Sequence, residues 1–194
     1  NGSGKSTLIK TICKINYPLF KKESHIKVFG YKNINIWDMR SKISFVITEI
    51  DKRIKKNVSV EDLILSGFQG TFGLVNKNLI NKEQLLKMND TLELLGIDFK
   101  NKFYSQLSDG QKRHVLIARA IVVKPKVLIL DEPTAMLDVK SSYKLLDTIS
   151  LLTRQGITLL YTTNDINNII KEISNVIFMK EGSILLQGSP NDVL

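Results

Sequence analysis

Apolar and polar residues in the first third of the chain follow both strand and helix spacings. The spacing predicts a helix over residues 5–15, a strand over Ile26–Phe29 that ends at Gly30, a short helical piece at Ile36–Arg40 and a second strand over Ile43–Ile47. Helices and strands therefore alternate here, which is typical of an α/β arrangement.

The middle of the chain, from about residue 58 to residue 119, changes to helical spacing. Ser59 is placed to cap a helix over Val60–Leu65, and the longest helical pattern runs over Leu79–Leu95. The glycine-containing stretch 67–73 between them is typical of a loop. This part of the chain is predicted to contain helices only.

Strand and helix alternate again after Pro125. The predicted elements are a buried strand over Val127–Leu130, a helix over Val139–Leu152, a second buried strand over Thr158–Tyr161, a short helix around Ile166–Lys171, and a hairpin of Val176–Met179 with Ile184–Leu186. The whole order predicts a mostly parallel α/β core that is interrupted by an all-helical insertion.

The first seven residues carry the clearest chemistry. They match the end of the phosphate-binding pattern GxxxxGK[ST], whose first glycine would fall two positions before Asn1. We therefore expect an N-terminal portion, with the strand that enters the loop, to be missing. Glycines let backbone N–H groups surround phosphate oxygens, Lys5 supplies a positive charge, and the hydroxyl of Ser6 would ligate magnesium. The alternative is an ordinary surface loop. The predicted nucleotide-binding residues are Asn1, Gly2, Ser3, Gly4, Lys5, Ser6 and Thr7.

Two adjacent carboxylates, Asp131 and Glu132, close the predicted strand after Pro125. Ligands of parallel sheets bind beyond the carboxyl ends of the strands. Asp131 is placed to hold magnesium, and Glu132 to act as a base or to orient a water that attacks the γ-phosphate. The alternative is a polar strand end before a turn at Pro133.

A third pattern is the run Leu107–Gln111. Ser108 is expected to cap a helix whose first turn contains Gly110, and a helix N-terminus with a serine hydroxyl is a second anion site. Taken alone, a capped helix is common and indicates no function.

The composition excludes several classes of protein. The 194 residues fit one large domain or a core with an inserted subdomain, and no apolar run approaches the length of a membrane span. The net charge is +9, but the lysines are scattered along the chain, which favours solvated faces over a nucleic-acid surface. The tightest cluster, at residues 52–56, is a candidate docking surface.

Cys13 is the only cysteine, so no disulfide or cysteine metal framework can form. His25 and His114 have no ligand-like neighbours and are predicted to be structural or exposed.

Taken together, the three patterns resemble the ATP-binding cassette (ABC) ATPases over the whole chain and in the family's order. Asn1–Thr7 resembles Walker A, Leu107–Gln111 the signature LSGGQ, Val127–Pro133 Walker B, and Ala135–Asp138 the D-loop. The resemblance implies a P-loop NTPase core of residues 1–57 and 120–194, and a helical subdomain of residues 58–119. The LSDGQ variant and the DEPTAMLD run look most like iron-siderophore or vitamin B12 importer ATPases, and residues 64–70 look like molybdenum-type ATPases.

The resemblance also implies a mechanism. Two cassettes would pack head to tail, and each ATP with its Mg²⁺ would lie between Walker A of one subunit and the signature of the other. The ATP-facing signature residues would be Ser108, Asp109, Gly110 and Gln111, with Asp138 in the D-loop. The partners would be a second ATPase subunit, with a homodimer expected, and transmembrane permease subunits, at the cytoplasmic face of the membrane; no nucleic acid is expected. The alternatives are a soluble non-transport ABC ATPase and an ATP-gated binding module that hydrolyses weakly.

Three positions depart from the family pattern. Thr48 stands where the Q-loop glutamine is usual, Asn164 replaces the switch histidine, and Asp109 replaces a signature glycine. Asparagine can bond a phosphate oxygen but cannot become positively charged. We therefore expect Lys5, Thr48, Glu132 and Asn164 to form the catalytic set, and we expect hydrolysis to be slow.

Overall fold

The computed structural model of the protein describes residues 2–19, 22, 25–32, 34–73 and 75–193. Its helices are α1 (Lys5–Ile12), α2 (Ile36–Arg40), α3 (Val60–Gln69), α4 (Lys82–Leu94), α5 (Asp109–Ile121), α6 (Val139–Arg154) and α7 (Pro190–Val193). Its strands are β1 (Ile43–Val46), β2 (Val127–Asp131), β3 (Thr158–Thr162), β4 (Val176–Lys180) and β5 (Ser183–Gly188). Short 3-10 helices lie at η1 (Thr48–Arg53), η2 (Lys77–Leu79), η3 (Tyr104–Gln106) and η4 (Ile166–Asn168).

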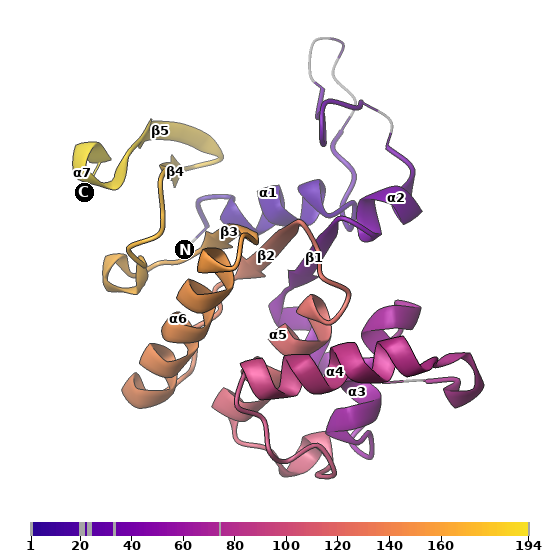
Figure 1. Cartoon of the computed structure of the whole chain (residues 1–194). Coiled ribbons are helices and arrows are strands. Elements are labelled where there is room, and N and C mark those ends of the chain that lie inside the picture. The colour runs from indigo at the N-terminus through magenta and orange to yellow at the C-terminus, as the bar shows by residue number, and fades with distance from the viewer. Residues whose placement is uncertain (1, 20–21, 23–24, 33, 74, 194) are drawn as a thin grey trace.

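A parallel sheet in the order β1-β2-β3 forms the centre of the fold. Ile43 pairs with Val127, and Asp131 pairs with Thr162 at the carboxyl end of the sheet. In Figure 1, α1 lies on the upper side of these strands and α5 and α6 lie below them. The buried run Leu128–Leu130 is apolar throughout because both faces of β2 are covered. The α/β class with a parallel sheet is confirmed.

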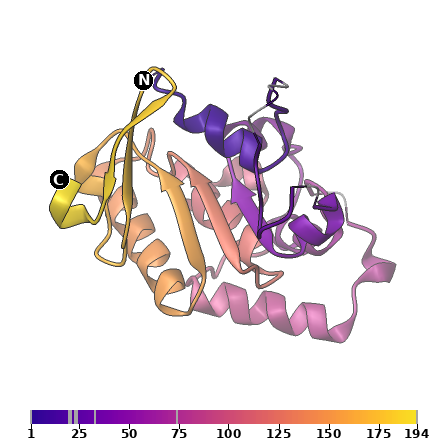
Figure 2. The ribbon, with the colours of Figure 1, turned by 90° about the horizontal axis from the view of Figure 1, so that it is seen from above.

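The antiparallel pair β4–β5 forms a separate hairpin. Viewed from above in Figure 2, this hairpin reaches back to the beginning of the chain. Its turn lies at Glu181 and Gly182, both with positive φ, between the two strands of the predicted hairpin. The hairpin therefore brings a distant part of the chain to the first residues.

Helices α3, α4 and α5 pack together on one side of the molecule (Figure 1). Ser59 caps α3 by accepting a hydrogen bond from the N–H of Asp62, as predicted. Gly67 lies inside α3, where a Cβ atom would come within 2.4 Å of the carbonyl oxygen of Arg119. The glycine therefore permits α3 and α5 to approach closely, and α3 continues to Gln69 through part of the stretch that was predicted to be a loop. The assignment of residues 58–119 to a separate subdomain stays a prediction.

Three further sequence predictions are corrected by the structure. The segment Ile26–Phe29 forms no strand, because Phe29 and Gly30 adopt positive φ and reverse the chain at once, leaving a single bridge between Val28 and Tyr31. The first helix ends at Ile12, since Lys14 has a φ of 57°. Strand β3 was predicted to be buried, but it is exposed at alternate residues, because the face that carries Thr158 and Leu160 is less covered than the other face.

Helix α4 begins at Lys82, after a capping box between Asn81 and Gln84, and η2 occupies residues 77–79. The predicted helix around Ile166–Lys171 is reduced to the 3-10 helix η4. No helix in the described part of the chain is long and apolar enough to cross a membrane.

Candidate active site

The phosphate loop leads directly into α1. Gly2 and Gly4 have φ of 82° and 95°, in the left-handed region that glycine adopts without strain. The N–H of Gly182, in the β4–β5 turn, donates a 3.1 Å hydrogen bond to the carbonyl oxygen of Ser3. A Cβ atom on Gly4 would lie 3.4 Å from the Cα atom of Gly182. The hairpin turn therefore packs directly against the loop, and Asn1 lies outside the described residues.

Lys5 begins α1, at the positive end of the helix dipole. Its Nζ atom donates a 3.0 Å hydrogen bond to Oγ of Ser3. Within the described ranges Lys5 forms no ion pair with a carboxylate, so its charge is not neutralised inside the protein. The start of α1 therefore combines helix dipole and lysine charge, which is the arrangement that binds phosphate.

Ser6 and Asp131 meet at the centre of the candidate site. The hydroxyl of Ser6 donates a 3.0 Å hydrogen bond to Oδ1 of Asp131, and the hydroxyl of Thr162 donates a 2.7 Å bond to the same oxygen. Asp131 is 5% exposed. The packing of α1 on β2 brings the two predicted magnesium residues together, although 125 positions separate them in the sequence.

These residues fit Mg²⁺. A serine hydroxyl and a carboxylate are hard oxygen ligands, and both point to one place. No cluster of three or more His, Cys, Asp or Glu side chains able to hold a metal occurs among the residues the structure describes. A cation held by Ser6 and Asp131 would take its other ligands from phosphates and water.

Glu132 follows Asp131 in a strained backbone conformation with a φ of 47°. Its N–H donates a 3.0 Å hydrogen bond to Oγ1 of Thr162, and Oε1 of its side chain accepts a hydrogen bond from Nδ2 of Asn164. The structure thus places the predicted base and the predicted switch residue in direct contact. Asn164 itself is exposed.

Thr162 is a residue of this site that the sequence reasoning missed. Its hydroxyl donates a hydrogen bond to Asp131 and accepts one from the N–H of Glu132. One buried side chain therefore orients both acidic residues. The available sequence signal was its position, because Thr162 directly follows the predicted strand Thr158–Tyr161, whereas its register with Asp131 comes from the pairing of β2 with β3. Polar residues that end neighbouring parallel strands meet at one edge of the sheet.

The predicted signature segment begins α5. Ser108 caps the helix with a capping box, in which its Oγ accepts a hydrogen bond from the N–H of Gln111 and Oε1 of Gln111 accepts one from the N–H of Ser108. The carboxylate of Asp109 pairs with Lys112 at 3.1 Å and is 74% exposed. Its negative charge is therefore turned toward a lysine on its own helix.

A cavity of about 460 Å³ lies between this segment and the residues before α6. Asp138 caps α6 by accepting a hydrogen bond from the N–H of Ser141. The hydrogen bond from the Ser141 hydroxyl, followed by this N–H bond, lowers the pKa of the Asp138 carboxyl group. The cavity is lined by Leu107, Ser108, Asp109, Gly110, Met136, Leu137, Asp138 and Ser141. Among the described residues, no hydrogen bond or ion pair joins 107–111 to the phosphate loop, so the two candidate anion-binding segments are not bonded to each other within one chain.

Thr48 begins η1, and its side chain lies outside the part of the chain that the structure describes. The next residue, Glu49, forms an ion pair with Lys10 of α1, and this hydrogen bond lowers the pKa of Glu49. The predicted Q-loop region is therefore joined by an ion pair to the helix that follows the phosphate loop.

Two other sequence candidates have simple environments. Cys13 is buried beneath the site, where desolvation and the charge of Asp131 raise the pKa of its thiol to about 12, so it is an inert core residue. Lys52, Arg53, Lys55 and Lys56 are all exposed, and Arg53 lies over the ring of Phe72. The use of this cluster as a docking surface stays a prediction.

Known proteins that resemble this chain in sequence belong to one family. The sequence profile described as "ABC transporter" matches residues 1–135. An energy-coupling factor transporter ATP-binding protein, EcfA1 of Streptococcus mutans, is 36% identical over the whole of this chain and 66% of its own length. A putative ABC transporter ATP-binding protein of Methanopyrus kandleri is 33% identical over the whole chain and 70% of its own length. The chain thus spans about two thirds of the length of these curated relatives.

Solved structures that resemble this chain are also ATP-binding cassettes or parts of ABC transporters. The cbiO1 protein of Clostridium perfringens, described as part of the ABC transporter complex cbiONQ, superposes with a TM-score of 0.82 at 34% identity, over 100% of this chain and 75% of its own. The ATP-binding cassette MJ0796, in a dimeric post-hydrolysis state bound to ADP and Pi, gives a TM-score of 0.75 at 25% identity, over 96% and 81% of the two chains.

Proposed function

This chain belongs to the ABC transporter family, and we propose that it is the ATP-binding and ATP-hydrolysing part of a transporter subunit. The observation that carries the proposal is the contact of Ser6 with Asp131 beside Lys5 and Glu132. These side chains supply, at one edge of the sheet, the groups that phosphoryl transfer needs. The relatives named above support the transport role.

Each residue of the site would have a separate role in binding or hydrolysing ATP. Backbone N–H groups of the phosphate loop and the charge of Lys5 would hold the β- and γ-phosphates. Ser6 and Asp131 would hold Mg²⁺, which when bound neutralises charge on the phosphate oxygens. Glu132 would accept a hydrogen bond from the attacking water and draw away its proton, and Thr162 holds the backbone that presents this carboxylate.

The site is completed by a second copy. Since the segment 107–111 makes no bond to the phosphate loop of its own chain, we propose that Ser108 and Gly110 contact ATP held by the partner. The dimer would form on ATP and open after hydrolysis. The dimeric state of MJ0796 supports a dimer for this chain too.

Slow hydrolysis is part of the proposal. Asn164 donates to Glu132, so an amide hydrogen occupies one carboxylate oxygen of the base. The amide cannot supply positive charge to the transition state, and the loss of such a contact costs on the order of 10²–10³ in rate. This contact favours the second candidate function, a module that ATP gates but that hydrolyses weakly.

The partners and location are proposed from the same relatives. We expect membrane subunits on the surface near η1, and a peripheral position at the membrane face where ATP is available. The named relatives favour the energy-coupling factor type, while resemblance to iron-siderophore, vitamin B12 or molybdenum importers stays a prediction.

Steady-state turnover of the purified protein that carries this chain tests the proposal. We expect Mg²⁺-dependent release of phosphate from ATP that Lys5→Ala abolishes and that Lys82→Ala, at an exposed position of α4, retains. A turnover of tens per second, roughly at the median for enzymes, would contradict the slow-hydrolysis part. Phosphate release that is unchanged in Lys5→Ala would contradict the whole assignment.

A further inference from the structure

We propose that His114 is a positioning residue of the signature segment, and that it takes up a proton when two copies of this chain close on ATP. The inference rests on the proposed function, because it concerns the surface that would meet ATP held by the partner. It adds a proton to the binding reaction and assigns that proton to one side chain.

His114 lies one turn into α5 and is 6% exposed. Its Nδ1 atom is 2.9 Å from the carbonyl oxygen of Gly110, and its Nε2 atom is 3.2 Å from Oγ1 of Thr148 on α6. The imidazole therefore joins the first turn of the signature helix to a neighbouring helix. A Cβ atom on Gly110 would come within 2.9 Å of Oγ of Ser141, so the starts of the two helices are also in close contact.

The neutral imidazole of His114 has too few hydrogens for all of these contacts. A carbonyl oxygen only accepts, so Nδ1 must carry a hydrogen for Gly110. The neutral ring then has a bare Nε2, which needs the hydroxyl hydrogen of Thr148. That hydroxyl also lies 3.0 Å from the carbonyl oxygen of Lys144, and it has only one hydrogen to donate.

Protonation removes the conflict. The imidazolium donates from Nδ1 to Gly110 and from Nε2 to Thr148, and Thr148 is then free to donate to Lys144. All three hydrogen bonds exist at once only when the ring is charged. The charged ring therefore holds the signature turn against α6 more firmly than the neutral one.

In the chain without ATP, the surroundings of His114 disfavour the protonated ring. Burial lowers the pKa of His114, and the positive charge of Lys144 on α6 lowers it further, while hydrogen bonds to the Gly110 and Lys144 backbone act in the other direction. Among the described residues, no charged side chain of α3, α4 or β1, the other elements that pack on α5, contributes to this shift, and Asp109 of the same helix pairs with Lys112. The ring is therefore neutral near pH 7 in the free chain.

ATP changes this balance in the closed dimer. The start of α5 would face the phosphates held by the partner, and nearby negative charge favours the protonated ring. Binding equilibria are reciprocal, so if ATP-driven closure favours the proton, acid must favour ATP-driven closure. The dimer should therefore tighten as the pH falls, with uptake of up to one proton per chain.

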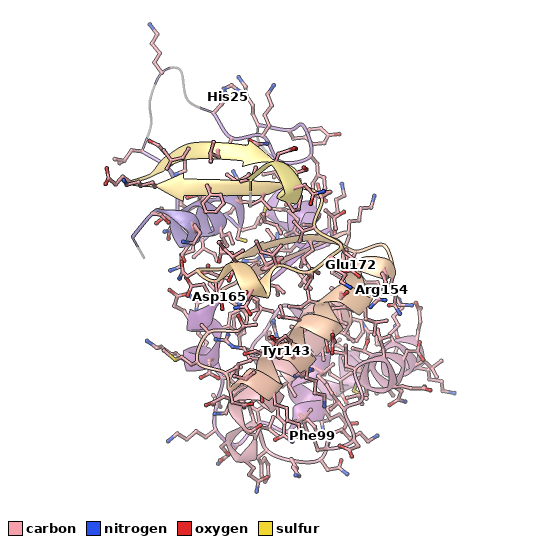
Figure 3. All side chains as sticks on the ribbon, turned by 90° about the vertical axis from the view of Figure 1, so that its left-hand side faces the viewer. His25, Phe99, Tyr143, Arg154, Asp165 and Glu172 are labelled. Carbon is pink, nitrogen blue, oxygen red and sulfur yellow. The ribbon has the colours of Figure 1, made fainter. Side chains whose placement is uncertain are left out.

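The test is the pH dependence of dimerisation by sedimentation, with saturating Mg-ATP and a Glu132→Gln background that slows hydrolysis. Between about pH 7.5 and about pH 5.5, the dissociation constant should fall about tenfold more than in His114→Gln. His114→Arg, with a permanent charge, should form a tight dimer at both pH values. The matched control is His25→Gln. His25 is exposed, and in Figure 3 it lies at the top of the view, away from Tyr143 of α6, the helix that contacts His114, so this variant should keep the full pH effect.

A second variant and a direct titration cover the case in which position 114 tolerates no change. Thr148→Val removes the acceptor for Nε2 and should reduce the pH effect. NMR titration of the ring, assigned by comparison with His25→Gln, should show a higher pKa of His114 in the ATP dimer than in the free chain. The same pH effect in the His114 variants, or a His114 pKa that ATP leaves unchanged, would overturn the inference. No ATP-dependent dimer at any pH would instead overturn the proposed function.

Discussion

Ser6 Oγ lies 3.0 Å from Oδ1 of Asp131, and the bond joins the first helix to the end of the central strand. This contact needs both the packing of α1 on β2 and the correct strand end, so it depends on the whole fold. The contact brings the phosphate-loop pattern and the carboxylate pattern together in one candidate magnesium–ATP site.

The Ser6–Asp131 contact predicts the effect of Asp131→Asn. Asparagine can still accept hydrogen bonds from Ser6 and Thr162, so the fold should survive, but it loses the charge that favours Mg²⁺. The gain in ATP affinity on adding Mg²⁺ should fall about tenfold or more, a loss of roughly 1.4 kcal/mol. Titration calorimetry with and without Mg²⁺ measures it. An equal gain in both proteins would show that Asp131 does not hold the metal, and Asp165→Asn is the matched control.

Glu132→Gln should separate binding from hydrolysis. The amide cannot accept the proton of water, so turnover should fall about 10²-fold or more, while ATP affinity should change little. Phosphate release and nucleotide binding measure the two effects. Glu93→Gln, on the exposed face of α4, makes the same chemical change away from the site and should have normal turnover. Normal turnover in Glu132→Gln would exclude the carboxylate as the base.

Asn164→His should raise turnover if the rest of the site is complete. Histidine can carry the positive charge that asparagine lacks, which is worth on the order of 10²-fold. Single-turnover phosphate release is the measurement, and Asn167→His, three residues further on, is the control. An unchanged rate would place the slow step elsewhere, for instance at Thr48.

Thr162→Val should damage both stability and activity. It removes the hydrogen bond to Asp131 and leaves the N–H of Glu132 without its partner, which costs about 1–3 kcal/mol of unfolding free energy. Urea unfolding measures the loss. Thr158→Val, at the exposed start of β3, makes the same change without a buried bond and should be close to neutral. Equal stability of the two variants would remove the role given to Thr162.

The His114 shift predicts how stability depends on pH. The folded chain lowers the pKa of this ring below its usual value of 6.5, so the neutral ring favours folding. That stability is fully present above about pH 6.5 and is lost as the pH falls through the folded pKa, because the unfolded chain binds the proton first. His114→Gln should make the urea midpoint less sensitive to acid below about pH 6.5, and His25→Gln should not. Greater acid sensitivity in His114→Gln would contradict the direction of the shift.

The sequence predicted those parts of the fold that depend on local pattern. Helix α2 and the β4–β5 hairpin lie close to where spacing and turn residues placed them, and Ser108 caps α5 through its hydroxyl. These features depend on neighbours within about four residues, which periodicity and capping rules describe.

Other features depend on distant partners, and the sequence pattern could not provide them. Phe29 adopts a positive φ that a sequence of β-forming residues does not predict, so the expected strand became a turn. The close approach at Gly67 depends on Arg119, which is far along the chain. Thr162 was overlooked because its importance comes from its register with Asp131, which only the paired strands show.

The most direct test of the composite site mixes two inactive variants. Lys5→Ala damages the phosphate loop, and Ser108→Arg places a bulky charge in the signature segment of an otherwise intact chain. A heterodimer of the two keeps one complete site, made by the loop of the second variant and the signature of the first. An equal mixture should therefore recover roughly a quarter of the wild-type phosphate release, since half of the dimers would have one intact site of two. Release no greater than the sum of the separate variants would contradict a site shared between two chains.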